Sequence, residues 1–500
     1  MIRRTFLKSL VANTVIASAG AAVIDSNVTS AEAAASRAPA PRAGAGKVAR
    51  KVIIGGAGIS GLCCGYELMK AGFDVTILEA AGRYGGHVFT GSDGFSDGLY
   101  ADFGADHLTR PGYERLLAYT EEFNIPVARY PNAEGAWLPY NDDDLRMVGG
   151  KRFTNRMLAD PGTLAQLGFN AREIRFLSHH PWYELQSFYL QRYADRIADP
   201  YHPFGSGRDD LDRIPVTAIY KREGASQAAI EYLGGDHISA LYAIWRMAAM
   251  RSRGIPPSEG EMFRLQGGNE QLPIAFARRL GSRVKLAHPI TAIRQSDRGV
   301  TVSYREYGYD EDETVDADFF VNCISLTVFR NIPITPALSA AKQYVVDNLT
   351  YESHPFYVFE AASRFWLEDG LKSINMELAH PDISSIWEVP SELATPRVIL
   401  KAYGPGGLSP QRVLAAFRQV YPGKRDTIVQ ALTKDWTQDK LTPNCEMEPF
   451  PIGEMHRFWP QVLEPEGRIY FAGTYADLLS RGMESCIRSA QRVARQIEAA

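Results

Sequence analysis

The stretch Val52-Ile53-Ile54-Gly55-Gly56-Ala57-Gly58-Ile59-Ser60-Gly61, followed by a helical run and then Val75-Thr76-Ile77-Leu78-Glu79, decides the fold of this chain. An apolar strand leads into a Gly-x-Gly-x-x-Gly turn, a helix follows, and a second strand ends in an acid, which is the dinucleotide fingerprint in its full context. The glycines permit a tight turn, close approach of the backbone to a pyrophosphate and close packing of helix on strand. We therefore expect Gly56, Gly58 and Gly61 to bind a dinucleotide, and a βαβ unit that binds nothing is the alternative.

Two further features of this stretch point to the same ligand. The helix that begins at Ile59 and Ser60 presents unpaired N–H groups and its positive dipole end to the phosphates. Glu79 lies 18 residues after Gly61, about where a carboxylate that binds the ribose belongs. We expect all of these residues to contact the cofactor.

Length and composition limit the classes of protein to consider. A chain of 500 residues allows two or more intertwined domains with a large core. Its 54 basic and 58 acidic residues give a net charge of -4, which does not suggest a nucleic-acid partner. The five cysteines are too few and too scattered for a disulfide framework or a zinc site, and we expect no metal. They are Cys63, Cys64, Cys323, Cys445 and Cys486.

The N-terminal segment reads as a targeting signal. Met1-Ile2-Arg3-Arg4-Thr5-Phe6-Leu7-Lys8 resembles the twin-arginine export signal, a weakly apolar stretch follows, and Ala31-Glu32-Ala33 offers a cleavage site. A disordered basic tail is the alternative. No segment has the ~20 continuous apolar residues of a membrane helix, so we expect no stable membrane span. We predict an export signal at 1–33, a flexible linker at 34–50 and an exported, periplasmic or secreted protein.

The remaining chain is expected to alternate between a nucleotide domain and a substrate domain. The nucleotide domain would comprise residues 51–110, 265–330 and 445–500, and the substrate domain a helical, aromatic-rich part at 111–264 and a sheet-forming part at 331–444. Periodicity predicts helices at 113–123, 227–233, 237–250, 410–420 and 482–497. It predicts strands at 284–286, 290–294, 300–304, 316–324, 356–359, 397–400 and 468–473. Those between 284 and 324 are expected to return the chain to the first sheet.

Several motifs resemble the flavin-containing amine oxidases, a family that includes monoamine, polyamine and L-amino acid oxidases. The matches span positions 52 to 490. They lie at 56–62, 78–80, Arg83-Tyr84-Gly85-Gly86-His87, Ala101-Asp102-Phe103-Gly104-Ala105, 267–273, Ile469-Tyr470-Phe471-Ala472-Gly473-Thr474 and Gly482-Met483-Glu484-Ser485. The resemblance implies an α/β fold, in which a Rossmann-like FAD-binding domain like that of glutathione reductase is joined to an α+β substrate domain.

The resemblance also implies where FAD would bind. The adenosine and ribose would meet Glu79, Ala80 and Ile290, and the helix at Gly482 and Met483 would direct N–H groups at the flavin O2 edge. Arg83 would place a permanent charge near the phosphates or ribose. The other expected contacts are Gly85, Gly86, His87, Ala105, Asp106, Gly473 and Thr474.

The chain departs from the family pattern at its expected reaction site. Family oxidases carry a lysine that holds a water at flavin N5, and the matching position is Phe356, with His354 as a possible substitute. The two tyrosines of the monoamine oxidase cage correspond to Gly482 and Glu446, which favours a larger or more polar substrate.

Two further positions leave alternatives open. The arginine that binds the substrate carboxylate in L-amino acid oxidases corresponds to His107, with Arg110 as a second candidate for that clamp or as a surface ion pair. Cys445 corresponds to the cysteine that is bonded to flavin in monoamine oxidases, and a buried inert thiol is its alternative.

The sequence therefore predicts an exported FAD-dependent oxidoreductase acting on a small-molecule amine. We expect hydride transfer from a CH–NH2 carbon, in the first instance of an L-amino acid, to flavin N5, with O2 as acceptor and imine, keto acid, ammonia and peroxide as products. Two alternatives remain: a dehydrogenase or desaturase with another electron acceptor, and a flavin-binding accessory protein with little turnover. A homodimer is possible, and the residues do not identify a general base.

Overall fold

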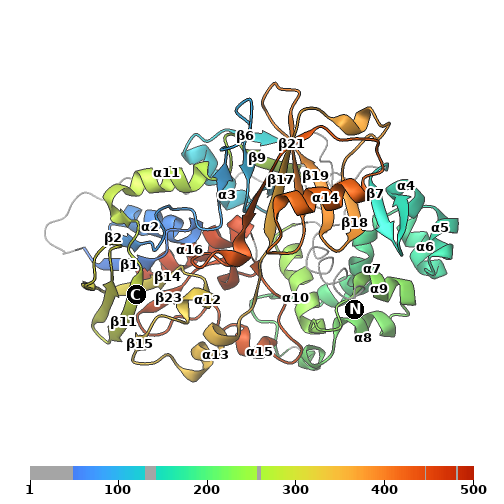
Figure 1. The fold of residues 1–500 in the computed structure, drawn as a ribbon. Coiled ribbons are helices and arrows are strands. Elements are labelled where there is room, and N and C mark those ends of the chain that lie inside the picture. The colour runs from blue at the N-terminus through green and yellow to red at the C-terminus, as the bar shows by residue number, and fades with distance from the viewer. Residues whose placement is uncertain (1–48, 130–141, 206, 256–260, 445, 480–481) are drawn as a thin grey trace, which may run out of the picture.

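A computed structural model describes residues 49–129, 142–205, 207–255, 261–444, 446–479 and 482–500. The predicted export signal, nearly all of the predicted linker and Cys445 lie outside these residues. Figure 1 shows a parallel sheet with its helices on the left, a mostly antiparallel sheet above the centre and a group of short helices on the right.

The first sheet has five strands, all paired in parallel, in the order β10-β2-β1-β14-β23. Val52, Ile53 and Ile54 of β1 are all buried, as expected for a parallel strand covered on both faces. The predicted βαβ unit is confirmed, with helix α2 between β1 and β2. The strands are β1 (Lys51–Gly55), β2 (Asp74–Leu78), β10 (Val284–Lys285), β14 (Phe319–Asn322) and β23 (Ile469–Phe471).

The C-terminal helix packs against the first helix of this unit. Val493 and Ile497 of α16 share one core with Leu62 and Leu68 of α2. The two ends of the described chain therefore complete a single cofactor domain, as the matched motifs implied. The helices around this core are α2 (Ile59–Lys70), α3 (Glu114–Glu122), α11 (Gln271–Leu280) and α16 (Gly482–Ala499).

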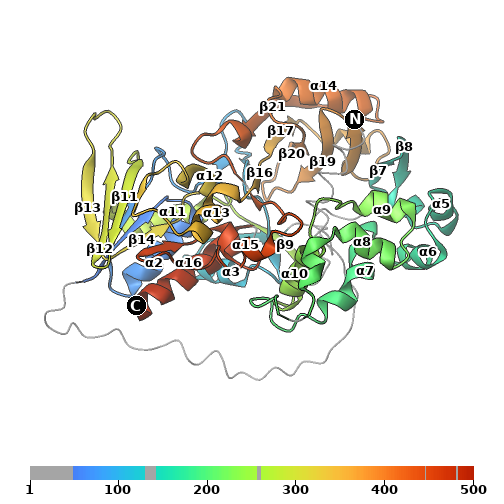
Figure 2. The same cartoon turned by 90° about the horizontal axis from the view of Figure 1, so that it is seen from below.

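A separate four-stranded sheet corrects one prediction. Strands β10 and β14 do join the first sheet, but the three strands between them pair with β15, which follows β14, in a sheet of order β13-β12-β11-β15. This sheet stands at one edge of the molecule in Figure 2. Short turns favour antiparallel pairing of sequential strands, whereas a parallel sheet needs long crossovers. The strand expected at 316–324 is also split at Asp318, whose carboxylate accepts a hydrogen bond from Lys51 N at 2.7 Å. The strands are β11 (Ile290–Ser296), β12 (Gly299–Tyr304), β13 (Glu313–Ala317) and β15 (Ile334–Thr335).

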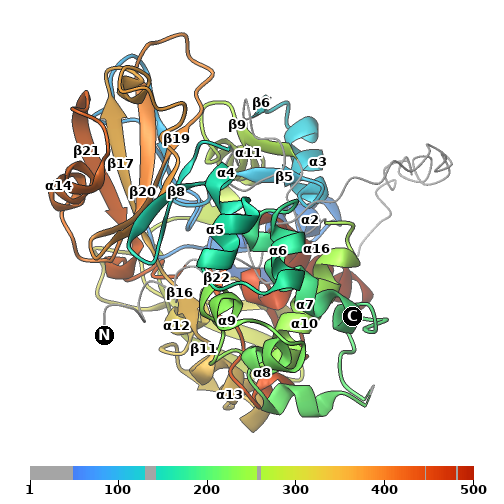
Figure 3. The ribbon, with the colours of Figure 1, turned by 90° about the vertical axis from the view of Figure 1, so that its right-hand side faces the viewer.

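A seven-stranded sheet of order β21-β17-β20-β19-β18-β7-β8 forms the second large layer, with α14 on its outer face in Figure 3. Alternation along β17 places Tyr357 and Phe359 in the core with α14, and Phe356 and Val358 in a core with residues 99–103. The sheet therefore links α14 to the cofactor domain. Its elements are β7 (Leu145–Val148), β8 (Lys151–Thr154), β17 (Pro355–Ala361), β18 (Met376–His380), β19 (Ile383–Val389), β20 (Val398–Tyr403), β21 (Ile428–Asp435) and α14 (Pro410–Val420).

Between 111 and 264 the described residues form a series of helices, as expected, but they also contribute β7 and β8 to the seven-stranded sheet. Helix α10 is buried nearly all round, and Ser239 caps it by accepting a hydrogen bond from Tyr242 N at 3.3 Å. The helices are α4 (Asn155–Leu158), α5 (Pro161–Gln166), α6 (Ala171–Leu177), α7 (Leu185–Ala194), α8 (Val216–Arg222), α9 (Gln227–Leu233) and α10 (Ala240–Arg251).

Short elements complete the described chain. The small sheets contain β3 (Thr90–Gly91) and β4 (Ala101–Asp102); β5 (Leu108–Arg110), β6 (Val127–Arg129) and β9 (Glu261–Leu265); and β16 (Tyr351–Glu352) and β22 (Glu446–Met447). The remaining helices are α12 (Leu326–Phe329), α13 (Ala340–Asn348) and α15 (Met455–Phe458). Within the described ranges, no helix combines the length and apolar character needed to cross a bilayer.

Candidate active site

The three fingerprint glycines meet three different constraints. Gly56 has φ of +96°, and a Cβ there would lie 3.2 Å from Cys323 O. A Cβ on Gly61 would collide with the carbonyl oxygen of Gly56, so helix and turn touch there. At Gly58, the nearest atom to an added Cβ is Gly86 Cα at 3.9 Å. The protein leaves space beside Gly58, as a backbone that lies against a pyrophosphate requires.

Glu79 follows β2 and lies against this turn. Its carboxylate accepts hydrogen bonds from Ala57 N at 2.6 Å and Ala81 N at 2.8 Å. Burial raises the pKa of Glu79, although these two hydrogen bonds oppose that effect. The carboxylate is thus fixed at the carboxyl end of β2, beside the glycine turn and in the place expected for a ribose ligand.

His87 and Arg83 come from the loop that approaches Gly58. The His87 ring lies on Trp436, with ring centroids 4.3 Å apart, and its Nε2 atom is buried with no hydrogen-bond partner. Burial lowers the pKa of His87 to about 3, so the ring is neutral. Arg83 donates to the carbonyl of Gly86 at 2.5 Å and does not extend into solvent. A buried nitrogen without a partner beside an open glycine turn fits a polar ligand such as FAD.

The C-terminal motif lies at the far end of the same sheet. Gly473 N donates to Ser489 Oγ at 2.9 Å, and Thr474 begins a short 3-10 helix at Thr474–Ala476. Met483 is buried in the core of the cofactor domain. Ile290, predicted to touch adenine, is half-buried at the start of β11, and its Cδ1 would lie 3.0 Å from a Cβ on Gly55. These residues therefore surround the carboxyl ends of the parallel strands, where nucleotides bind in open α/β sheets.

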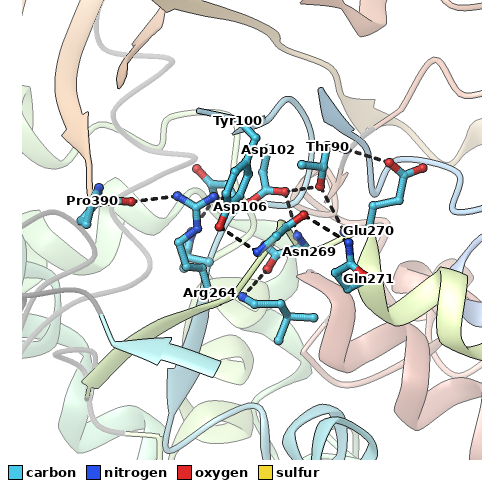
Figure 4. A network of polar contacts seen from close by, with 12 residues as sticks. Thr90, Tyr100, Asp102, Asp106, Arg264, Asn269, Glu270, Gln271 and Pro390 are labelled. Atoms are coloured by element: carbon cyan, nitrogen blue, oxygen red, sulfur yellow. Dashed lines mark hydrogen bonds and ion pairs between the residues drawn. The ribbon is translucent and has the colours of Figure 1, made fainter. Parts of the chain in front are cut away.

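A buried polar network joins the cofactor domain to neighbouring segments (Figure 4). Asp102 Oδ1 accepts from Thr90 Oγ1 at 2.6 Å and from Asn269 N at 2.9 Å, and Arg264 lies 3.8 Å from its other oxygen. Arg264 also donates to Pro390 O at 2.8 Å. Burial raises the pKa of Asp102, and the Arg264 guanidinium opposes the rise. The network holds the 101–105 motif, including Ala105, whose carbonyl accepts from the Asn269 amide at 3.0 Å.

Asp106 and His107 follow that motif and meet a lysine from the seven-stranded sheet. Asp106 Oδ1 lies 2.7 Å from His107 Nδ1, and Asp106 Oδ2 lies 2.8 Å from Lys401 Nζ. Burial alone would raise the pKa of Asp106, but Lys401 and His107 together hold it well below its usual range. The Lys401 side chain is 1% exposed and also donates to Asp102 O at 2.7 Å. An ionised carboxylate thus connects the two large layers.

Phe356 is buried on β17, and the ammonium group of Lys401 lies against its ring. Val358 pairs with Lys401 across β17 and β20, so strand alternation places both on the face that contains Phe356. Lys401 Nζ lies 4.0 Å from the centre of the Phe356 ring, within the range of a cation–π contact. That position 356 corresponds to the family lysine stays a prediction, and the ammonium group of Lys401 lies beside it.

The remaining predicted site residues are more dispersed. Arg110 is exposed and lies over Phe263 with 5.7 Å between the guanidinium carbon and the ring centre. Glu446 is half-buried and pairs with Glu352 across β16 and β22. Gly482 has φ of +69°, and a Cβ there would collide with the Tyr113 hydroxyl, so an aromatic side chain from another element occupies this space.

Sequence reasoning missed Lys401 and Trp436. The signal for Lys401 was a charged residue inside the apolar run Val398-Ile399-Leu400-Lys401-Ala402-Tyr403, where a lysine is buried only with partners. Trp436 carried no such signal. Its Nε1 donates to Phe103 O at 2.6 Å, a contact between positions far apart in the chain.

Comparison with known proteins agrees with this geometry. Residues 59–498 match the sequence profile of a family described as flavin containing amine oxidoreductase. The chain belongs to this family. Its cofactor is FAD, and the turn around Gly58 and the buried Nε2 of His87 are suited to hold it. The predicted fold class is confirmed.

Individual relatives cover almost the whole chain. An L-amino-acid oxidase of Vipera ammodytes ammodytes is 24% identical over 483 residues, which is 90% of this chain and 93% of that protein. The flavin-containing amine oxidase A of Canis lupus familiaris is 24% identical, over 89% of this chain and 84% of that protein. The solved structure of a putrescine oxidase superposes with a TM-score of 0.73 at 21% identity, covering 91% of this chain and all of the other. That last likeness supports the fold alone.

Proposed function

We propose that this protein oxidises the CH–NH2 group of a small-molecule amine, with an L-amino acid as its substrate class. FAD would supply the hydride acceptor and O2 would reoxidise it, so that the products are an imine and hydrogen peroxide, and water would hydrolyse the imine to a keto acid and ammonia. The observation that carries the proposal is the Lys401–Asp106–His107 contact, which places charged groups where the cofactor domain meets the seven-stranded sheet. Relatives named L-amino-acid oxidase that match 90% of the chain support the substrate class.

The chain's own residues have distinct tasks in this reaction. Gly58 and Glu79 hold the nucleotide part of the cofactor. Phe356 and the aromatic cluster around it exclude water from one side of the site, since Phe356 packs at 5.4 Å from Tyr403 between ring centres. His107 is the polar side chain at the position that corresponds to the carboxylate ligand of L-amino acid oxidases.

A second candidate is a dehydrogenase that uses a quinone or a protein as electron acceptor. Phe356 in place of the family lysine motivates it, because a water held there would otherwise assist the reaction with oxygen. Lys401 beside Phe356 favours the oxidase.

The deciding experiment reduces the bound flavin anaerobically with matched substrate pairs. L-Phenylalanine with phenethylamine, and L-lysine with cadaverine, differ mainly in the carboxylate, and the D-amino acids serve as stereochemical controls. Loss of flavin absorbance with the L-amino acids alone supports the proposal, and loss with the amines alone refutes the substrate class. If neither kind bleaches the flavin, the accessory-protein alternative is correct. Peroxide formed in air at one equivalent per substrate separates the oxidase from the dehydrogenase.

Export and self-association complete the proposal. The paired arginines at 3 and 4 motivate twin-arginine export, and Arg3→Lys with Arg4→Lys is expected to leave the protein in the cytoplasmic fraction, while the unchanged chain reaches the periplasm or medium. A homodimer would elute at about twice the mass of the 55.4 kDa chain on a calibrated sizing column with light scattering.

A further inference from the structure

Asp106 divides its two oxygens between two different layers of the fold. Oδ1 lies 2.7 Å from Nδ1 of its neighbour His107, and Oδ2 lies 2.8 Å from Nζ of Lys401 on β20. His107 is 16% exposed, Asp106 15% and Lys401 1%. The lysine is therefore fully buried behind the carboxylate, whereas the carboxylate and the imidazole are each partly exposed.

This arrangement fixes which nitrogen of His107 carries the proton. An ionised carboxylate accepts hydrogen bonds and cannot donate them, so Nδ1 of His107 must be the N–H that faces Asp106. The neutral imidazole then has its lone pair on Nε2, which is the proton-accepting atom. A histidine whose Nδ1 is held by a carboxylate is also more basic at Nε2.

The loop that carries this histidine lies directly against the cofactor cradle. Ala105 N donates to His87 O at 3.3 Å, and a Cβ on Gly104 would lie 3.2 Å from His87 Nδ1. The unpartnered Nε2 of His87 marks the cradle that FAD fits. His107 thus lies one short loop away from the expected cofactor, on the side that faces the second sheet.

We infer that His107 is the catalytic residue that takes a proton from the substrate ammonium, and that Asp106 and Lys401 are its positioning residues. The inference rests on the proposed function. An amine reaches the site as R–NH3⁺ at neutral pH, and its nitrogen has no lone pair to stabilise the carbon that loses hydride. One N–H bond of the ammonium breaks, its electron pair stays on the amine nitrogen, and the proton forms a bond with Nε2. Asp106 then stabilises the imidazolium.

The charged groups beside this contact pair with one another. Lys401 on β20 contacts Asp106 and also donates to Asp102 O, and Arg264 on β9 lies 3.8 Å from the Asp102 carboxylate. The Asp106 carboxylate contacts the His107 ring directly.

The first test compares pH profiles of kcat/KM for the full holoenzyme and for His107→Gln. General base catalysis contributes about 10²- to 10⁴-fold, so we expect a loss of about 100-fold at pH 7. The loss should shrink as the pH approaches the pKa of the substrate ammonium, because free amine then needs no proton acceptor. A loss of equal size from pH 6.5 to 9.5 would mean a structural role and overturn the assignment.

A matched control is available on the surface. His202 makes the same kind of pair, with Nδ1 2.6 Å from Asp199 Oδ2, but its side chain is 83% exposed. His202→Gln should keep the wild-type pH profile. If instead His107→Gln raises KM for amino acids alone and leaves the profile of kcat unchanged, His107 binds the substrate carboxylate and the proton-acceptor role is excluded.

The second test does not depend on turnover. Nitrogen-15 NMR of the substrate-free protein distinguishes the two imidazole tautomers, and the His107 signals are those lost in His107→Gln. We expect the Nδ1–H tautomer in the wild type and a shift toward Nε2–H in Asp106→Asn. An Nε2–H tautomer in the wild type would overturn the inference even if amines bleach the flavin. Failure of every amine to bleach the wild-type flavin would instead defeat the proposed function, and the tautomer would still report on the geometry.

Discussion

Gly58→Ala should separate cofactor binding from folding. The backbone of Gly58 has φ of -67° and ψ of 173°, a conformation open to alanine, and the nearest protein atom to the new methyl is Gly86 Cα at 3.9 Å. The folded protein without cofactor can therefore accept the substitution. The methyl would, however, lie between the helix N-terminus and the pyrophosphate, so the substitution should weaken the binding of FAD.

The expected change in stability and the expected change in FAD affinity differ enough to be measured separately. At a compatible site, Gly→Ala changes stability by about 0.4–1 kcal/mol in the favourable direction, because the unfolded chain loses freedom. One lost hydrogen bond to a charged group costs about 1.5–3 kcal/mol, which is roughly 10- to 150-fold in the Kd for FAD at about 1.4 kcal/mol per tenfold. Flavin fluorescence titration of the stripped protein gives Kd, and thermal unfolding of the same sample gives Tm.

Two other glycines serve as references for this experiment. Gly82→Ala has no atom within 4 Å of the new methyl and should retain the wild-type Kd, with a Tm no lower than that of the wild type. Gly61→Ala drives its methyl into the Gly56 carbonyl and should lower Tm even without FAD. The reasoning would be refuted by a Gly58→Ala protein that binds FAD as tightly as Gly82→Ala, or that unfolds as readily as Gly61→Ala.

Three further predictions concern Glu484, Lys401 and Gly482. Burial raises the pKa of Glu484 from 4.5 to about 7. The contribution of the Glu484 carboxyl group to the free energy of unfolding is therefore full below pH 4.5 and falls by about 3 kcal/mol as the pH rises through 7. Tm measured from pH 4.5 to 8 should fall less steeply in Glu484→Gln than in the wild type. Lys401→Met leaves the Asp106 carboxylate without its cation and should cost about 3–5 kcal/mol in denaturant unfolding, with part of the loss recovered when Asp106→Asn is added; purely additive losses would contradict the ion pair. Gly482→Ala should lower Tm because its φ is +69° and its Cβ meets the Tyr113 hydroxyl, and Tyr113→Phe in the same chain should recover the steric part of that loss, whereas unchanged Tm values would show that the helix start relaxes freely.

The sequence could predict the cofactor domain because its signals are local. The turn from Gly56 to Gly61 and the carboxylate of Glu79 combine strand, turn and helix within thirty residues, and each glycine meets a backbone constraint that its neighbours impose. The amphipathic pattern of 410–420 likewise gives α14 with the bounds that were predicted. The sheet predicted for the strands between 284 and 324 was wrong for β11, β12 and β13, because periodicity gives the faces of a strand but not the sheet that it joins.

The reaction site could not be predicted in the same way, because its contacts join positions that are distant along the chain. Asp106 and Lys401 are separated by 295 residues, and no local pattern pairs a carboxylate after one motif with a lysine in another strand. Phe356 alone suggested that this position lacks an ammonium group. The pairing of β17 with β20 places the ammonium group of Lys401 on the same face of the sheet as Phe356. The sequence by itself determined the nucleotide fold and its cofactor, since backbone conformation is a local property. Only the tertiary structure decided which charges meet around His107, since burial and pairing depend on how two sheets pack.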